Sequence, residues 1–70
     1  MLFEPLPQEI KAARLKAGLT QTGAAELVYV KLRIWQYWEA MDEDKQVKMP
    51  LATWELFLIK TGQHKIKVKK

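Results

Sequence analysis

The fold is decided by residues 18–39, which read GLTQTGAAELVYVKLRIWQYWE. Thr20 suits the N-cap of a short helix over about 21–28, because its hydroxyl can accept a hydrogen bond from a free N–H of the first turn. A further helix is expected over about 31–40. Because only two or three residues would separate the two helices, the chain must turn sharply between them. The stretch therefore predicts a helix-turn-helix.

The segments on either side of this stretch share one pattern, with a proline at the start and a glycine past the end. The first opens at Pro7 and stops before Gly18, and the second opens at Pro50 and stops before Gly62. Proline suits the first position of a helix, and glycine suits the position after its end. Two more helices are therefore expected, at about 7–17 and 50–61. The predicted fold is all-α, a compact bundle of four or five short helices.

Length and composition allow one small domain. The chain has 70 residues, 49% of them hydrophobic, and no cysteine, so its core must form without disulfides. We assign residues 1–63 to the helix-turn-helix domain, with a loop at 41–49, and residues 64–70 to a basic tail. Alternation in the tail predicts a short strand pairing with Leu2 and Phe3. A flexible arm on phosphates and an idle solvated tail are the alternatives.

Charge is concentrated at the end of the chain. The net charge is +4, and residues 60–70 hold five lysines and no acid. The other 59 residues hold 12 − 5 = 7 basic and 8 acidic side chains, a net of −1. The basic balance is therefore mostly a property of the tail, and it indicates a nucleic-acid or acidic partner only weakly.

Catalytic chemistry is poorly provided for. The chain contains no cysteine, serine or asparagine, and His64 is its one histidine. Nucleophile–base pairs and metal clusters need convergent groups of these kinds. We expect no enzyme, no metal site, no cofactor and no small-molecule ligand. The absence of cysteine, of a secretory signal and of a run of ~20 apolar residues predicts a cytoplasmic protein without a membrane partner.

The predicted helix at 31–40 has two contrasting sides, because successive residues are turned by about 100°. One side is large and apolar and should face the core; it carries Lys31, Ile34, Trp35 and Trp38. The opposite side is polar; it carries Arg33, Gln36 and Tyr37, with Leu32 at its edge. An ordinary solvated surface would be just as polar.

Residue type and position favour a DNA-reading role for the polar side. A short helix after a tight turn can enter a major groove with its N-terminal half. There Arg33 can pair with guanine, Gln36 with adenine, and Leu32 can meet a thymine methyl group.

An arginine stands in the core-facing stripe of the first helix. The positions i, i+3, i+4 and i+7 of a buried stripe fall on Ile10, Ala13, Arg14 and Ala17. A buried arginine requires a carboxylate partner. Glu39, at the end of the predicted 31–40 helix, is the best candidate.

Residues 18–39 resemble the helix-turn-helix of the lambda-repressor and Cro (Xre-type) family, without a gap. The matching positions are Leu19, Thr20, Gln21, Ala25, Val30, Trp38 and Glu39. Within that family, RIWQYWE (33–39) looks most like small phage regulators that accompany anti-CRISPR genes. The segment KMPLATWELFLIKTG (48–62) is similar to the fourth helix of such proteins.

The resemblance implies a function and a set of site residues. A bacterial or phage-encoded repressor would bind an inverted-repeat operator as a dimer and regulate its own operon. Gln21 would touch a phosphate or base, and Arg14 and Glu39 would form the buried ion pair of the family. The implied groove-facing positions are Lys31, Leu32, Arg33 and Tyr37.

Two positions depart from the family pattern. Tyr29 stands at the turn position usually held by glycine, where a positive φ would strain it. Lys31 stands where serine or threonine usually caps the recognition helix, so that cap is lost or mediated by water, and the ammonium could bind a phosphate instead.

A protein-binding module of the same fold, such as an antitoxin or adaptor, is the alternative function. The predicted helix at 50–61 is apolar over more than one face, with Leu51, Trp54, Leu56, Phe57, Leu58 and Ile59. This excess predicts burial against a twin protomer, through this helix or the termini, or against a foreign protein. Basic residues and an exposed tyrosine would also suit RNA.

Overall fold

The computed structural model describes residues 4–42, 44 and 46–63. Within these ranges the chain forms α-helices and no strand; the helices are α1 (Pro7–Lys16), α2 (Gln21–Leu27), α3 (Leu32–Glu39) and α4 (Leu51–Lys60). The predicted all-α bundle of short helices is confirmed. The strand or arm predicted for 64–70, its pairing with Leu2 and Phe3, and His64 lie outside the described residues.

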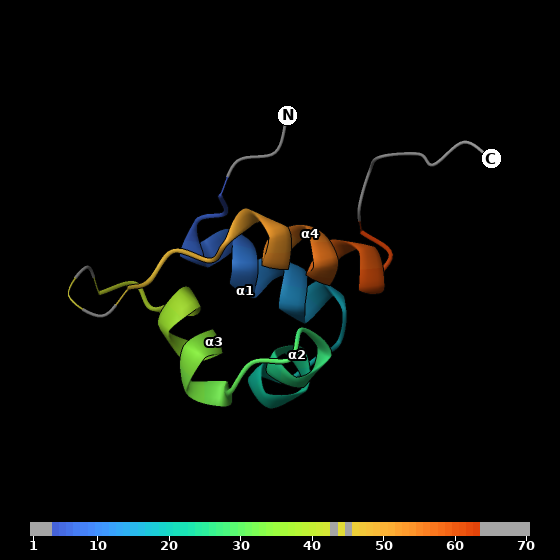
Figure 1. Cartoon of the computed structure of the whole chain (residues 1–70), viewed down its shortest axis with the longest axis horizontal. Helices are drawn as coiled ribbons and strands as arrows, with labels where there is room; N and C mark the ends of the chain where they lie inside the picture. Colours follow the sequence, from blue (N-terminus) through green and yellow to red (C-terminus); the bar gives the residue numbers. More distant parts are fainter. Residues whose placement is uncertain (1–3, 43, 45, 64–70) are drawn as a thin grey trace.

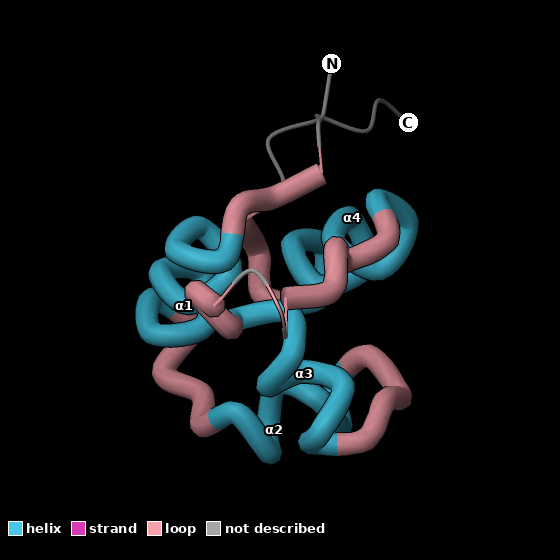
Figure 2. Tube along the Cα trace, turned by 90° about the vertical axis from the view of Figure 1, so that its left-hand side faces the viewer, coloured by secondary structure: helices cyan, strands magenta, loops and turns pink. Residues whose placement is uncertain are grey.

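The helices are arranged around α3. It packs against α2 and α1, and α2 also contacts α4. Figure 1 shows α2 and α3 together on one side of the molecule, with α1 and α4 on the other. In Figure 2, α1 and α4 stand apart, and α2 and α3 lie below them. The link from α2 to α3 is residues 28–31, so it is longer than the two or three residues expected, but the turn is still tight.

The starts of the helices follow the sequence signals with one exception. Pro7 is the first residue of α1, as predicted. The hydroxyl of Thr20 accepts a hydrogen bond from the N–H of Gly23 at 3.0 Å, so the predicted N-cap of α2 is confirmed. Pro50 was expected inside α4 but is its N-cap, one position before the first helical residue. Proline fits there because it lacks the N–H that a cap would leave free.

Three helices end in the same way, with a positive φ just after the cap. The positions are Gly18 (φ 72°), Tyr29 (φ 64°) and Gly62 (φ 74°). In each, the following N–H bonds back to a carbonyl in the last turn, which is the Schellman motif. The closing hydrogen bonds run from Leu19 to Arg14 (3.1 Å), Val30 to Ala25 (3.0 Å) and Gln63 to Leu58 (2.7 Å).

Tyr29 is the unusual member of this set. Glycine adopts a positive φ without steric penalty, whereas a residue with a Cβ is strained there by about 1–2 kcal/mol. A positive φ at Tyr29 was considered from the sequence, and the structure shows that this tyrosine adopts one.

The core is built around the aromatic side of α3. Trp35 is fully buried, and its ring lies 5.1 Å from Phe57 and 5.6 Å from Trp38, centroid to centroid. Trp38 and Trp54 are buried as well, as predicted. Each ring removes a large apolar area from water, so this cluster is the main contribution to the stability of a domain this small.

The core side predicted for the 31–40 helix is wrong at two of its four residues, because Lys31 and Ile34 are both exposed. Ile34 was placed on the core side of the 31–40 helix, but its side chain is 39% exposed, because α3 turns only its Trp35 and Trp38 edge inward. Met49 lies in the loop predicted at 41–49, and its side chain is fully buried there, which no pattern in the sequence indicates. Its burial anchors the segment that leads into α4. Ile59, one of the excess apolar residues of α4, is 59% exposed.

Candidate nucleic-acid interface

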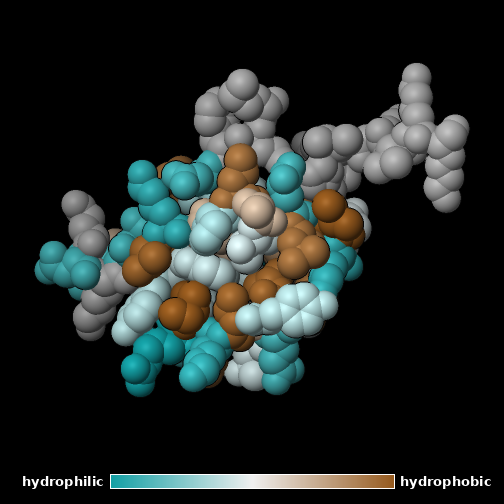
Figure 3. Space-filling view, viewed as in Figure 1, coloured by the Kyte–Doolittle hydropathy of each residue, from teal (hydrophilic) through white to brown (hydrophobic). Residues whose placement is uncertain are grey.

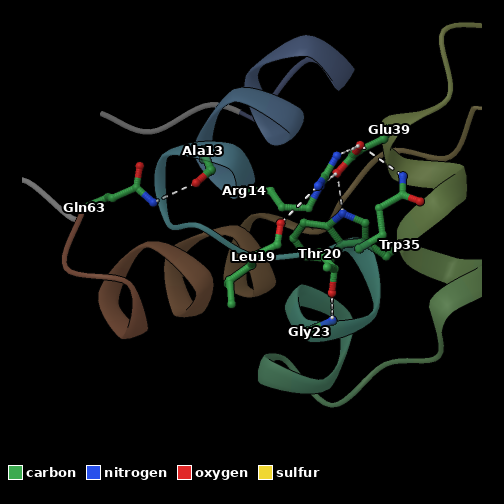
Figure 4. A network of polar contacts seen from close by, with 9 residues as sticks. Ala13, Arg14, Leu19, Thr20, Gly23, Trp35, Glu39 and Gln63 are labelled. Carbon is green, nitrogen blue, oxygen red and sulfur yellow. Dashed lines mark hydrogen bonds and ion pairs between the residues drawn. The ribbon is translucent and has the colours of Figure 1, made fainter.

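A buried ion pair fixes the orientation of α3. Nε of Arg14 lies 2.6 Å from Oε2 of Glu39, and Nη2 donates to Oε1 at 3.1 Å. Their side chains are only 11% and 5% exposed. The predicted pair is thus confirmed, and its two parallel contacts tie α1 to the end of α3 (Figure 4).

Glu39 is also the acceptor for two other side chains. The indole N–H of Trp35 donates to Oε2, and the amide of Gln21 donates to Oε1 at 3.1 Å. Burial alone would raise the pKa of Glu39, but the hydrogen bonds from Arg14, Trp35 and Gln21 and the charge of Arg14 outweigh it. The pKa therefore falls below its ordinary value of 4.5, and the carboxylate stays ionised near neutral pH.

Arg14 extends this network to the start of α2. Its Nη1 donates to the backbone carbonyl of Leu19 at 3.0 Å, just before the Thr20 cap (Figure 4). One guanidinium therefore holds three parts of the chain: α1, the entry to α2 and the end of α3. Both side chains of the ion pair at the centre of these contacts are almost fully buried.

The outer side of α3 presents the predicted contact residues. Lys31, Leu32, Arg33, Gln36 and Tyr37 are all exposed, although Leu32 and Tyr37 only to 38% and 37%. Within the part of the chain that the structure describes, neither the guanidinium of Arg33 nor the amide of Gln36 has a hydrogen-bond partner. The donors and acceptors of this side are available to a ligand.

Lys31 is the N-cap of α3 and makes no capping hydrogen bond with its side chain. The loss of the usual cap at this position agrees with the sequence expectation. Because its side chain is exposed at the entry to α3, its ammonium is placed to meet an anion approaching that end of the helix.

Gln21 lies at the start of α2 and is half-buried. One amide N–H is bonded to Glu39, a contact that the sequence did not reveal. A glutamine amide has a second N–H and a carbonyl oxygen, so it can still reach a phosphate or base. Its DNA contact stays a prediction, and Glu39 restrains the side chain that would make it.

Sequence reasoning missed a polar pair beside the α2–α3 turn. Nζ of Lys60, the last residue of α4, donates to the hydroxyl of Tyr29 at 2.8 Å and to the carbonyl of Leu27 at 2.9 Å. It also lies 4.1 Å from the centre of the Tyr29 ring, within range of a cation–π interaction. Periodicity along one helix cannot reveal a contact between residues 31 positions apart.

Comparison of the sequence with protein-family models gives no match, and comparison with curated proteins gives none either. The resemblance to the lambda-repressor and Cro family thus rests on the residues quoted above and stays a prediction. Over the described ranges, no group of three or more potential metal ligands occurs, and no helix is long and apolar enough to span a bilayer.

Proposed function

We propose that this protein is a sequence-specific repressor that binds double-stranded DNA by placing α3 in the major groove. The observation that carries the proposal is the contrast across α3. Trp35 and Trp38 hold one side in the core, while Arg33 and Gln36 on the other have no partner among the described residues. A rigid helix with free hydrogen-bonding groups is suited to read base edges.

The resemblance supports a narrower form of the proposal. The protein would bind an inverted repeat as a homodimer, with half-sites about one helical turn of DNA apart. It would repress a phage or mobile-element operon that includes its own gene, by excluding polymerase. The exposed Ile59 on α4 is available for contact between protomers.

Selection from random duplex DNA at near-physiological salt tests this function. We expect an inverted repeat to be recovered, and Arg33→Ala to lose about 1–3 kcal/mol of binding and to relax one base position. Arg33→Lys should keep the charge but lose the two-pronged recognition of guanine. Lys16→Ala, an exposed position on α1, is the matched control and should bind like the parent. Recovery of no motif by the parent would overturn the proposal.

Lys31 should behave differently from Arg33 in the same assay. A phosphate contact carries no sequence information, so Lys31→Ala should weaken binding to all sequences evenly. A changed site preference in this variant would show that Lys31 reads a base.

The second candidate function is a protein-binding module, such as an antitoxin or adaptor. Its support is the apolar surface: Leu6, Leu15 and Ile59 are each more than half exposed. Figure 3 shows hydrophobic side chains reaching the surface among hydrophilic ones on one face of the molecule. The mass of the purified protein in solution separates the two candidates. A stable dimer favours the repressor, whereas a monomer that selects no DNA motif favours the protein-binding module.

A further inference from the structure

Tyr29 and Lys60 form an exposed polar pair at the start of the recognition helix, outside the polar side of α3. Tyr29 is 79% exposed, the highest value among the large hydrophobic residues of the described chain. Its hydroxyl and ring both interact with Lys60, which is itself exposed. We call these two residues the Tyr29–Lys60 pair.

Neither backbone conformation nor burial accounts for a tyrosine here. The equivalent positions after α1 and α4 are glycines, which adopt positive φ freely. Tyr29 adopts φ 64° with a Cβ and leaves most of its ring in water. Strained residues that persist without a packing role cluster at functional sites. The position therefore points to a use for the side chain.

The pair has two hydrogen-bond donors left over. A lysine ammonium has three N–H groups, and Lys60 uses two, on Leu27 and Tyr29. The Tyr29 hydroxyl accepts a hydrogen bond from Lys60, and no described residue accepts a hydrogen bond from the O–H of Tyr29. The two donor atoms are 2.8 Å apart and accompany a full positive charge. Two oxygens of one phosphate group can accept from both donors at once.

The pair and Gln21 lie at opposite ends of α2, and the length of this helix is close to the width of a major groove. It lies just past the C-terminal end of α2, whereas Gln21 begins that helix. Seven residues of helix span about 10 Å, close to the ~12 Å width of the groove. With α3 in the groove, contacts at the two ends of α2 could reach the backbones that flank it.

We infer that the Tyr29–Lys60 pair binds a DNA backbone phosphate at the edge of the groove that α3 enters. The inference rests on the DNA-binding function proposed above. The hydrogen bond from Lys60, and then its charge, lower the pKa of the Tyr29 hydroxyl below 10.0, which makes the hydroxyl a stronger donor. A phosphate contact of this kind adds affinity and orients the protein without reading sequence.

Salt-dependent binding to the selected duplex tests the inference. Lys60→Met should reduce the slope of log affinity against log salt by about 0.9, the value for one phosphate contact. Tyr29→Phe keeps the ring over Lys60 but removes the hydroxyl, and should weaken binding roughly 3- to 10-fold. Both variants should keep the parent's order of preferred sequences. Lys16→Met is the control and should leave the slope unchanged.

A further variant separates a binding role from a structural one. Tyr29→Gly relieves the strained φ, so it should not lower the midpoint of thermal unfolding, yet it should weaken DNA binding. If Tyr29→Gly and Tyr29→Phe bind as tightly as the parent, the inference is wrong. A changed sequence preference in either would also overturn it, because it would indicate a base contact. If the parent binds no duplex, the proposed function fails, and the inference fails with it.

Discussion

The two sides of α3 place similar polar groups in opposite surroundings. On the inner side, the Glu39 carboxylate accepts hydrogen bonds from Arg14, Gln21 and Trp35 and is almost fully buried. On the outer side, Arg33 and Gln36 are exposed and have no partner among the described residues. A change on the inner side should therefore alter the free energy of unfolding. A change on the outer side should alter the free energy of binding and leave the fold intact.

The largest expected effect is on the inner side, at Trp35. Trp35→Ala removes the ring that contacts Phe57 and Trp38 and leaves a cavity, so we expect it to lower the free energy of unfolding by about 3–5 kcal/mol. That is a large share of the stability of a small domain. Urea unfolding followed by circular dichroism measures it. A variant as stable as the parent would show that the aromatic cluster is not the main source of stability.

Glu39→Gln should have the next largest effect. The substitution keeps the size of the side chain but leaves the Arg14 guanidinium buried without a counter-charge, at a cost of about 3 kcal/mol. The double variant Arg14→Met with Glu39→Gln should regain part of this loss, because no unpaired charge is left in the core. If the loss of stability in the double variant equalled the sum of the losses in Glu39→Gln and Arg14→Met, the two side chains would be energetically independent.

Acid should weaken the inner side in a way that depends on Glu39. The folded pKa of this carboxyl is lowered below 4.5, so the unfolded chain binds its proton more readily. Its contribution to stability is full above about pH 4.5 and is lost as the pH falls through the folded pKa. Between pH 7 and pH 3, the free energy of unfolding should decrease more steeply for the parent than for Glu39→Gln. An equal dependence on pH in the two proteins would show that Glu39 does not contribute to the loss of stability in acid.

The smallest effect on folding is expected on the outer side. Arg33→Ala and Gln36→Ala should change the free energy of unfolding by no more than about 0.5 kcal/mol, because both side chains are exposed and neither has a partner among the described residues. Binding to the selected duplex should nevertheless weaken in both. A marked loss of stability in either variant would show that the outer side also contributes to folding.

Much of the fold could be predicted because its signals are local or periodic. The Pro7 start, the Thr20 cap and the glycines after α1 and α4 mark helix ends through backbone chemistry that needs no tertiary information. The Arg14–Glu39 pair was found because a charge in an apolar stripe requires a partner, and few acids were placed to supply one.

The missed features all depend on tertiary contacts. Met49 is buried by the path of the chain into α4, which no periodic pattern encodes. Ile34 is exposed because Trp35 and Trp38 form the side of α3 that is buried. The bond from Gln21 to Glu39 and the Tyr29–Lys60 pair join side chains far apart in sequence. For the outer side of α3, the sequence predicted the exposure of Arg33, Gln36 and Tyr37, and their contacts with DNA stay a prediction.

The Schellman closures have a consequence for how the molecule opens. The N–H groups of Leu19, Val30 and Gln63 lie outside the helices, yet each is bonded back into the last turn of one. These amides should exchange with solvent deuterium slowly, at rates similar to those of the helices they close. For Val30 this means that the turn between α2 and α3 opens together with α2. The two helices would then keep their relative orientation for as long as α2 itself remains folded.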